Sequence, residues 1–288
     1  MSLSANEQSP PSLEAGIVSP TSAVPGVFWK EFWCLLALAI ISVTVGLVPV
    51  VTSVSAMPAG RILETQVIFT FVASIVFAAI IYLGLRLSSQ IRLPRAPILE
   101  ALLGRRRVLP LVLRILAPAL TLGLIYLLLA VFLANQLPHL LGPAPRGVKA
   151  PELLTFGPPG QQRQLHLAGP VGFAVALGFP LFEEIFFRLF LFTLIAWLFS
   201  RIFRSPEGKP SSTVFWMANI TQALAFGLFH LPNGSTVWWE PWFMQVLAAP
   251  QCWLGLIAGY LFWHYGLEAS VLAHLTADLL LVIGIAFS

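Results

Sequence analysis

Long apolar runs with very few charges constrain this chain more than any other feature. Only 10% of its 288 residues are charged, 58% are hydrophobic and the mean hydropathy is +0.86, whereas soluble globular proteins carry about 25% charged residues. A chain of this composition lacks the polar surface needed to enclose an apolar core in water. We therefore expect an all-α, polytopic membrane protein, a transmembrane helix bundle with lipid as its outer solvent.

The apolar runs predict seven membrane spans, or eight if the longest run is divided. A span needs about 20 residues, whereas the run from Leu167 to Phe203 is much longer and contains Pro180. We expect this run to be kinked, tilted or broken in two. The expected spans cover residues 32–55, 65–87, 109–133, 167–203, 213–231, 242–263 and 267–287.

The chain divides by composition into three parts. Residues 1–26 are rich in Ser, Pro and small polar residues and are expected to form a disordered tail. Residues 27–166 contain the first spans and a loop rich in arginine, and residues 167–288 contain three clusters of ionisable residues inside apolar runs. Cys34 and Cys252 also lie in apolar runs and are expected to be buried and reduced.

The basic residues predict the orientation of the chain. Of the 16 Lys and Arg residues, eleven fall on one side of the expected spans, four fall on the other and Arg188 lies within the membrane. Because cytoplasmic loops carry the excess of basic residues, we expect a cytoplasmic amino terminus in a protein of the cell membrane. The net charge of +4 then reflects topology, so the expected partner is the lipid bilayer and not nucleic acid.

The first ionisable cluster contains two adjacent glutamates, Glu183 and Glu184, followed by Arg188. Charges inside a span are costly, so each is a candidate functional group with a partner to be found. Glu184 and Arg188 have the i, i+4 spacing and the acid-first order that favour an ion pair within one helix. This pairing leaves Glu183 without a cation and suited to accept and return a proton. The alternative is that both glutamates share Arg188 in a structural role.

The other two clusters contain histidine. His230 ends an apolar run and follows Phe226 by four residues; such a histidine is often only a structural hydrogen-bonding group. His274 and Asp278 are one helical turn apart and share a face. An acid beside an imidazole fixes its tautomer and supports its protonated form, although a polar pair can also simply join helices. Together, acids and histidines on three spans are what a hydrolytic site inside a membrane would require.

The expected depths of these residues agree only in part. Glu183 and His230 each lie about 17 residues from the expected cytoplasmic end of their spans, which corresponds to roughly 25 Å. His274, counted from Gly266, would lie only about 12 Å from that end. The three side chains can meet only if the last helix begins deeper in the protein than the span boundaries indicate.

The three clusters form ordered motifs that resemble a known family. The motifs are Glu183-Glu184-x-x-x-Arg188, then Phe226-x-x-x-His230, then His274-x-x-x-Asp278 preceded by Gly266-Leu267-x-x-Ser270. They resemble the CAAX protease and bacteriocin-processing family of intramembrane proteases, also called CPBP or Abi, which includes the type II CAAX prenyl endopeptidases. The resemblance covers about residues 169–281, so residues 167–288 are expected to form a catalytic bundle.

The resemblance also implies roles for individual residues. Glu183 with His230 would activate the attacking water, while His274 and the residue at position 278 would stabilise the oxyanion, with no metal required. The candidate catalytic residues are Glu183, Glu184, His230, His274 and Asp278, with Arg188 in a structural ion pair.

One of these residues departs from the family pattern, which usually has Asn in place of Asp278. A carboxylate cannot donate a hydrogen bond to an oxyanion unless it is protonated. Asp278 would therefore either orient His274 or, together with His230 and His274, bind a divalent metal such as zinc.

The leading functional hypothesis is an intramembrane endopeptidase, a hydrolase that cleaves a membrane-associated protein or peptide. A zinc-type intramembrane metalloprotease that uses the same residues is the alternative among enzymes. Outside enzymes, the buried acids and histidines could form the proton path of a transporter, or the protein could be a scaffold without catalytic activity. We find no inverted repeat that would favour a transporter.

Overall fold

The computed structural model describes residues 25–54, 59–141, 153–156, 163–166, 169–203, 210–230 and 250–286. Residues 1–24 of the predicted tail lie outside this described part of the chain, as do residues 242–249 of the sixth predicted span. The division into three parts is not tested and stays a prediction.

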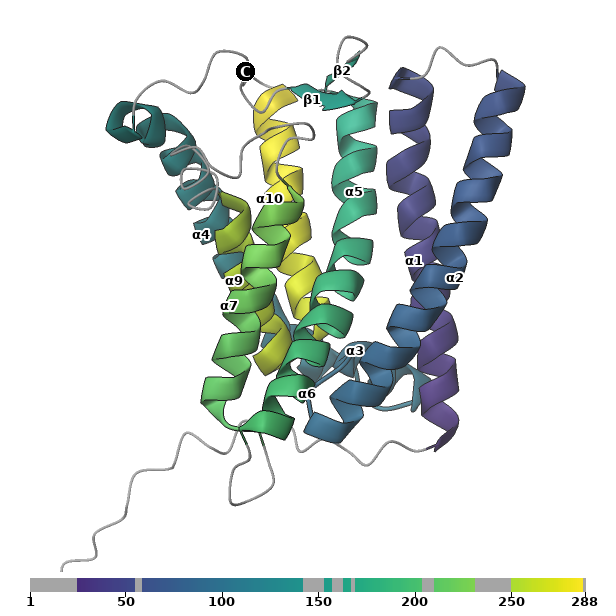
Figure 1. Ribbon diagram of the computed structural model, residues 1–288, viewed down its shortest axis with the longest axis vertical. Coiled ribbons are helices and arrows are strands. Elements are labelled where there is room, and N and C mark those ends of the chain that lie inside the picture. The colour runs from purple at the N-terminus through teal and green to yellow at the C-terminus, as the bar shows by residue number, and fades with distance from the viewer. Residues whose placement is uncertain are drawn as a thin grey trace, which may run out of the picture.

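Helices make up nearly all of the described chain (Figure 1). They are α1 (Pro25–Val54), α2 (Ala59–Ile91), α3 (Pro97–Leu103), α4 (Leu109–Leu141), α5 (Pro170–Glu184), the π-helical segment η2 (Ile185–Phe192), α6 (Thr193–Ile202), α7 (Ser212–Phe229), α9 (Pro250–Tyr265) and α10 (Leu267–Ala286). The antiparallel strands β1 (Leu153–Phe156) and β2 (Arg163–His166) form one short hairpin. The predicted helical bundle is confirmed, and the hairpin is an addition that we did not expect.

Within the described residues, five helical stretches are long and apolar enough to cross a membrane. They are Gly26–Leu47, Gly60–Ile91, Leu109–Phe132, Pro170–Ile202 and Leu267–Gly284. Large apolar side chains are exposed along α1, α2 and α4, as expected for surfaces that face lipid. The chain is therefore an integral membrane protein, whereas the count of seven spans stays a prediction.

The longest apolar run stays one helical stretch. α5, η2 and α6 follow one another without a break from Pro170 to Ile202, and Pro180 lies inside α5. The described part of the run is therefore continuous, and the number of spans that it forms stays a prediction. The π-helical segment begins directly after Glu184, and such segments inside α-helices are frequent at functional sites.

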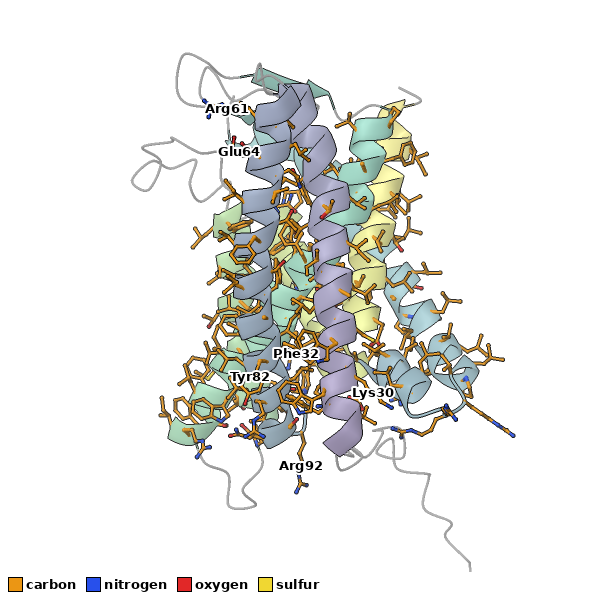
Figure 2. All side chains as sticks on the ribbon, turned by 90° about the vertical axis from the view of Figure 1, so that its right-hand side faces the viewer. Lys30, Phe32, Arg61, Glu64, Tyr82 and Arg92 are labelled. Carbon is orange, nitrogen blue, oxygen red and sulfur yellow. The ribbon has the colours of Figure 1, made fainter. Side chains whose placement is uncertain are left out.

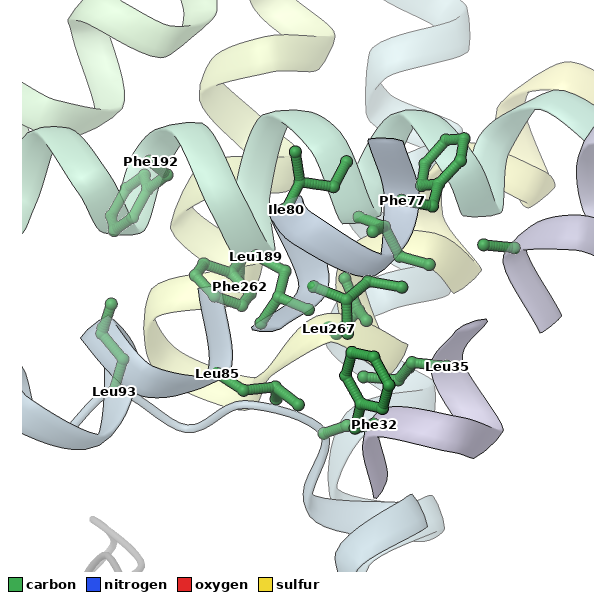
Figure 3. Packing of buried hydrophobic residues seen from close by; sticks show 14 of the residues in the cluster. Phe32, Leu35, Phe77, Ile80, Leu85, Leu93, Leu189, Phe192, Phe262 and Leu267 are labelled. Carbon is green, nitrogen blue, oxygen red and sulfur yellow. The ribbon is translucent and has the colours of Figure 1, made fainter. Parts of the chain in front are cut away.

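This stretch is the centre of the bundle. α5 and η2 contact α1 and α2 on one side and α7, α9 and α10 on the other. The largest buried apolar cluster joins side chains of these helices, among them Phe77, Leu189, Phe192 and Phe262 (Figure 3). Helices α4 and α10 approach closely at Gly123, where an added Cβ would lie 2.6 Å from the Ala273 carbonyl oxygen.

The three labelled basic residues lie at the ends of the bundle that the sequence predicts for them (Figure 2). Lys30 and Arg92 lie at one end, and Arg61 and Glu64 lie at the other (Figure 2). Arg95 is an exception among the arginines that we assigned to topology, because its side chain is buried and lies 3.2 Å from a carboxylate oxygen of Glu31. Its contribution is therefore to packing inside the protein.

One smaller prediction concerns the cysteines, and two glycines of α9 show how closely that helix packs. Cys34 and Cys252 are free; Cys252 is buried as expected, whereas Cys34 is only half-buried. An added Cβ at Gly255 would lie 2.7 Å from the Ala223 Cα atom of α7, and one at Gly259 would overlap the Asn219 side chain. The two glycines thus allow close packing of α7 and α9, as expected for a small-xxx-small pair.

Candidate active site

Three helices bring the predicted site residues together. Glu183 and Glu184 end α5, His230 follows the last residue of α7, and His274 lies in the first half of α10. The Glu183 and His274 side chains are 8% and 5% exposed, whereas His230 and Asp278 are 25% and 30% exposed. His230 and Asp278 are therefore less buried than Glu183 and His274.

The Glu183 carboxylate faces both histidine rings. Its Oε2 atom lies 3.7 Å from His230 Nε2 and 3.9 Å from His274 Nε2. These distances exceed an ordinary hydrogen bond. They leave the oxygen and either nitrogen close enough to bond to the same water molecule.

His230 has a defined tautomer. Its Nδ1 atom lies 2.8 Å from the Phe226 carbonyl oxygen, and a carbonyl oxygen can only accept a hydrogen bond. The hydrogen of the neutral ring is therefore on Nδ1, and Nε2 faces Glu183 as an acceptor. A water molecule between these two acceptors would donate one hydrogen to each and keep its lone pairs for attack.

Glu184 differs from its neighbour in its partners. One oxygen lies 2.8 Å from His274 Nδ1, and the other lies 3.0 Å from Arg188 Nε. The predicted i, i+4 pair of Glu184 and Arg188 is therefore present, and no ion pair of Arg188 with Glu183 is found among the described residues. The ionised Glu184 carboxylate accepts a hydrogen bond from His274 Nδ1, and this bond fixes the orientation of the ring. The other ring nitrogen, Nε2, then points at Glu183.

The Arg188 guanidinium is completely buried and contacts both flanking helices. Its Cζ atom lies 4.6 Å from the centroid of the Phe226 ring, and its Nη2 atom donates to the Leu254 carbonyl oxygen at 3.5 Å. The Phe226 ring also lies 4.4 Å from the His230 ring. We did not predict the contacts of Arg188 with Leu254 and with the Phe226 ring, because both join residues on different helices.

Asp278 is the least enclosed member of the group. Its Oδ2 atom lies 3.6 Å from His274 Nε2, one helical turn earlier on α10. The same ring nitrogen therefore faces the carboxylates of Glu183 and Asp278. Because Nδ1 already donates to Glu184, Nε2 is a hydrogen-bond donor only in the protonated form of the ring.

The expected difference in depth is wrong. His274 reaches both glutamates, so it lies at the same level as they do. The helix that carries it begins at Leu267, and the Leu267 backbone N–H donates to the Arg95 carbonyl oxygen at 2.7 Å. α10 therefore starts inside the protein, against the segment that leads into α3.

In the part of the chain that the structure describes, no group of three or more His, Cys, Asp or Glu side chains has the geometry to hold a metal ion. The shortest contact in the group is the hydrogen bond between His274 and Glu184, which occupies one of the two ring nitrogens.

The comparison with protein families supports the motif analysis. Residues 166–280 match the family model described as type II CAAX prenyl endopeptidase Rce1-like. Comparisons with curated proteins and with solved structures gave no match. The matched residues include all three motifs and every candidate site residue. The predicted resemblance is thus confirmed: residues 166–280 of this chain are similar to the Rce1-like type II CAAX prenyl endopeptidases, a family of membrane-embedded proteases.

Proposed function

We propose that this protein is an intramembrane endopeptidase that hydrolyses a peptide bond of a membrane-associated protein or peptide. The observation that carries the proposal is the position of the Glu183 carboxylate. It is buried, has no Lys or Arg partner among the described residues, and faces Nε2 of His230 and of His274. A water molecule held there would be in contact with a base and next to a hydrogen-bond donor.

The proposed reaction uses water as the nucleophile. Glu183 takes a proton from a water molecule that also donates to His230 Nε2, and the oxygen of that water attacks the peptide carbonyl carbon. His274 Nε2 donates to the carbonyl oxygen as it becomes negative. The tetrahedral intermediate then collapses, the C–N bond breaks, and Glu183 returns the proton to the leaving amine.

Glu184 and Arg188 support this reaction without contact with the substrate. Glu184 accepts a hydrogen bond from His274 Nδ1 and so fixes the direction of Nε2. Arg188 balances the charge of Glu184 inside the protein. Although Glu184 is one of the predicted catalytic candidates, we assign it to positioning.

Protease activity can be tested in cells through the termini of membrane proteins. Cells with the wild-type chain are compared by mass spectrometry with cells that carry the Glu183→Gln variant. We expect a set of new protein termini only with the wild-type chain, because the variant lacks the base. Identical termini in both would contradict the proposed function.

The substitution Asp278→Asn separates the water mechanism from a metal mechanism. In the water mechanism Asn can itself donate to the oxyanion, so activity should be preserved or raised, and chelators should have no effect. A zinc site would lose affinity, because an amide is a much poorer ligand than a carboxylate. Activity lost in Asp278→Asn and in chelator, and regained with added zinc, would establish the metalloprotease.

The same proposal includes an orientation in the cell membrane. With the amino terminus in the cytoplasm, the end of the bundle that carries Lys30 and Arg92 is cytoplasmic. A cysteine introduced at Ser89 should then resist a membrane-impermeant label in intact cells, whereas one at Glu64 should react. The reverse pattern of labelling would overturn this orientation.

A further inference from the structure

The turn between α9 and α10 rests on the start of α3. The Leu267 N–H donates to the Arg95 carbonyl oxygen at 2.7 Å, and a Glu268 carboxylate oxygen accepts from the Leu99 N–H at 2.9 Å. Gly266 has a φ of +93°, and an added Cβ there would lie 2.3 Å from a ring atom of Pro97. Three successive residues thus join the base of α10 to one short segment.

That segment is itself anchored to the first two helices. The buried Arg95 side chain lies 3.2 Å from Glu31 of α1 and donates to Ser89 near the end of α2 at 3.3 Å. It also pairs with Glu100 of α3 at 3.0 Å. The segment is therefore a fixed support, and we call residues 95–99 the α3 base.

Glu268 completes a helix end that would otherwise lack a cap. The first N–H groups of a helix have no partner within the helix, and Ala96 at the N-cap of α3 has no side chain that could accept from them. The Glu268 oxygen supplies that acceptor from another helix. Among the described residues, its second oxygen is buried and has no hydrogen-bond partner, so the oxygen that accepts from Leu99 carries this contact.

This contact bears on the site through α10. His274 is six residues after Glu268 in the same helix, which places it about 9 Å along the helix axis. Its hydrogen bond to Glu184 is 2.8 Å long, so a displacement of the His274 ring away from Glu184 by about 1 Å would lengthen it beyond the usual limit of about 3.2 Å. The support under α10 therefore determines whether His274 reaches the two glutamates.

We propose that Glu268 is a positioning residue, which sets the height of His274 in the site by holding α10 on the α3 base. The expected loss of turnover rests on the proposed protease function, whereas the expected displacement of His274 does not. The reaction then also depends on residues 95–99, because they hold α10 in place. These residues lie outside the segment that the family model matches.

The test compares three replacements of Glu268 with one control. Glu268→Ala removes the acceptor, Glu268→Asp keeps the charge but withdraws the acceptor by about one carbon–carbon bond, and Glu268→Gln keeps an oxygen at the same reach. Glu64→Ala removes an exposed glutamate of α2 and serves as the control. Each protein is reconstituted in lipid and labelled with ¹⁵N-histidine, and the His274 Nδ1 resonance is identified by its loss in His274→Gln.

We expect the His274 Nδ1 resonance to move in Glu268→Ala and Glu268→Asp and to stay in place in Glu268→Gln and in the control. A displacement of about 1 Å can reduce turnover on the order of 10²-fold, so kcat should fall by about that factor in the first two variants. KM should change much less, since substrate contacts are retained. If Glu268→Ala does not fold, the comparison of Glu268→Asp with Glu268→Gln tests the inference.

Two results would overturn the inference. One is an unchanged His274 resonance in Glu268→Ala or, where that variant does not fold, in Glu268→Asp. The other is equal damage in Glu268→Gln and Glu268→Ala, which would mean that the charge and not the acceptor matters. If the wild-type protein cleaves nothing, the proposed function fails while the resonance still tests the position of His274.

Discussion

The Glu183→Gln variant should fold and insert normally and lose cleavage activity by about 10³-fold, within the range expected for removal of a general base. Gln has nearly the same shape as Glu but cannot take a proton from water at neutral pH. Glu183 has no ion pair with Arg188 among the described residues, so its neutralisation leaves no buried cation unpaired. The measurement is the initial rate with a peptide identified from the comparison of cellular termini.

A matched control is available on α2. Glu64 is exposed and lies at the end of the bundle opposite Lys30 (Figure 2), so Glu64→Gln makes the same chemical change away from the site. It should retain full activity. If Glu183→Gln were as active as this control in detergent, Glu183 could not be the base.

Replacing Arg188 by Met should mainly reduce stability. The guanidinium and the Glu184 carboxylate are both completely buried, and removal of one partner leaves the other charge uncompensated at a cost of about 3–5 kcal/mol. We expect a lower yield and a clearly lower unfolding temperature in detergent. The measurement is thermal unfolding of the purified protein, with Arg61→Met at an exposed position as the control.

A double variant tests the cause of that loss. Glu184→Gln combined with Arg188→Met removes both charges, and the Gln oxygen can still accept from His274 Nδ1. Because no buried charge then lacks a partner, the double variant should recover most of the stability. If it were less stable than Arg188→Met alone, the stranded carboxylate would not be the reason.

The sequence by itself was sufficient to predict a helical membrane protein and its chemical groups. Charge density and the length of apolar runs are properties of composition, and in lipid they allow few structures other than helices. The pair of Glu184 and Arg188 is also local, since the i, i+4 spacing places both on one helix face. The motifs around His230 and His274 indicated the protease family because they occur in a specific order and spacing.

Only the tertiary structure decided how these groups meet. The spacing along the chain could not reveal that Glu184 binds His274 while Glu183 faces both histidines, because these contacts join different helices. It also gave the wrong depth for His274, since the start of α10 depends on its contact with Arg95 and Leu99. Arg95 was likewise counted among the loop arginines that indicate membrane orientation. Its burial against Glu31 depends on how α1 packs. Local sequence determines which segments are helical. The position of one helix along the axis of another depends on contacts between residues far apart in the chain.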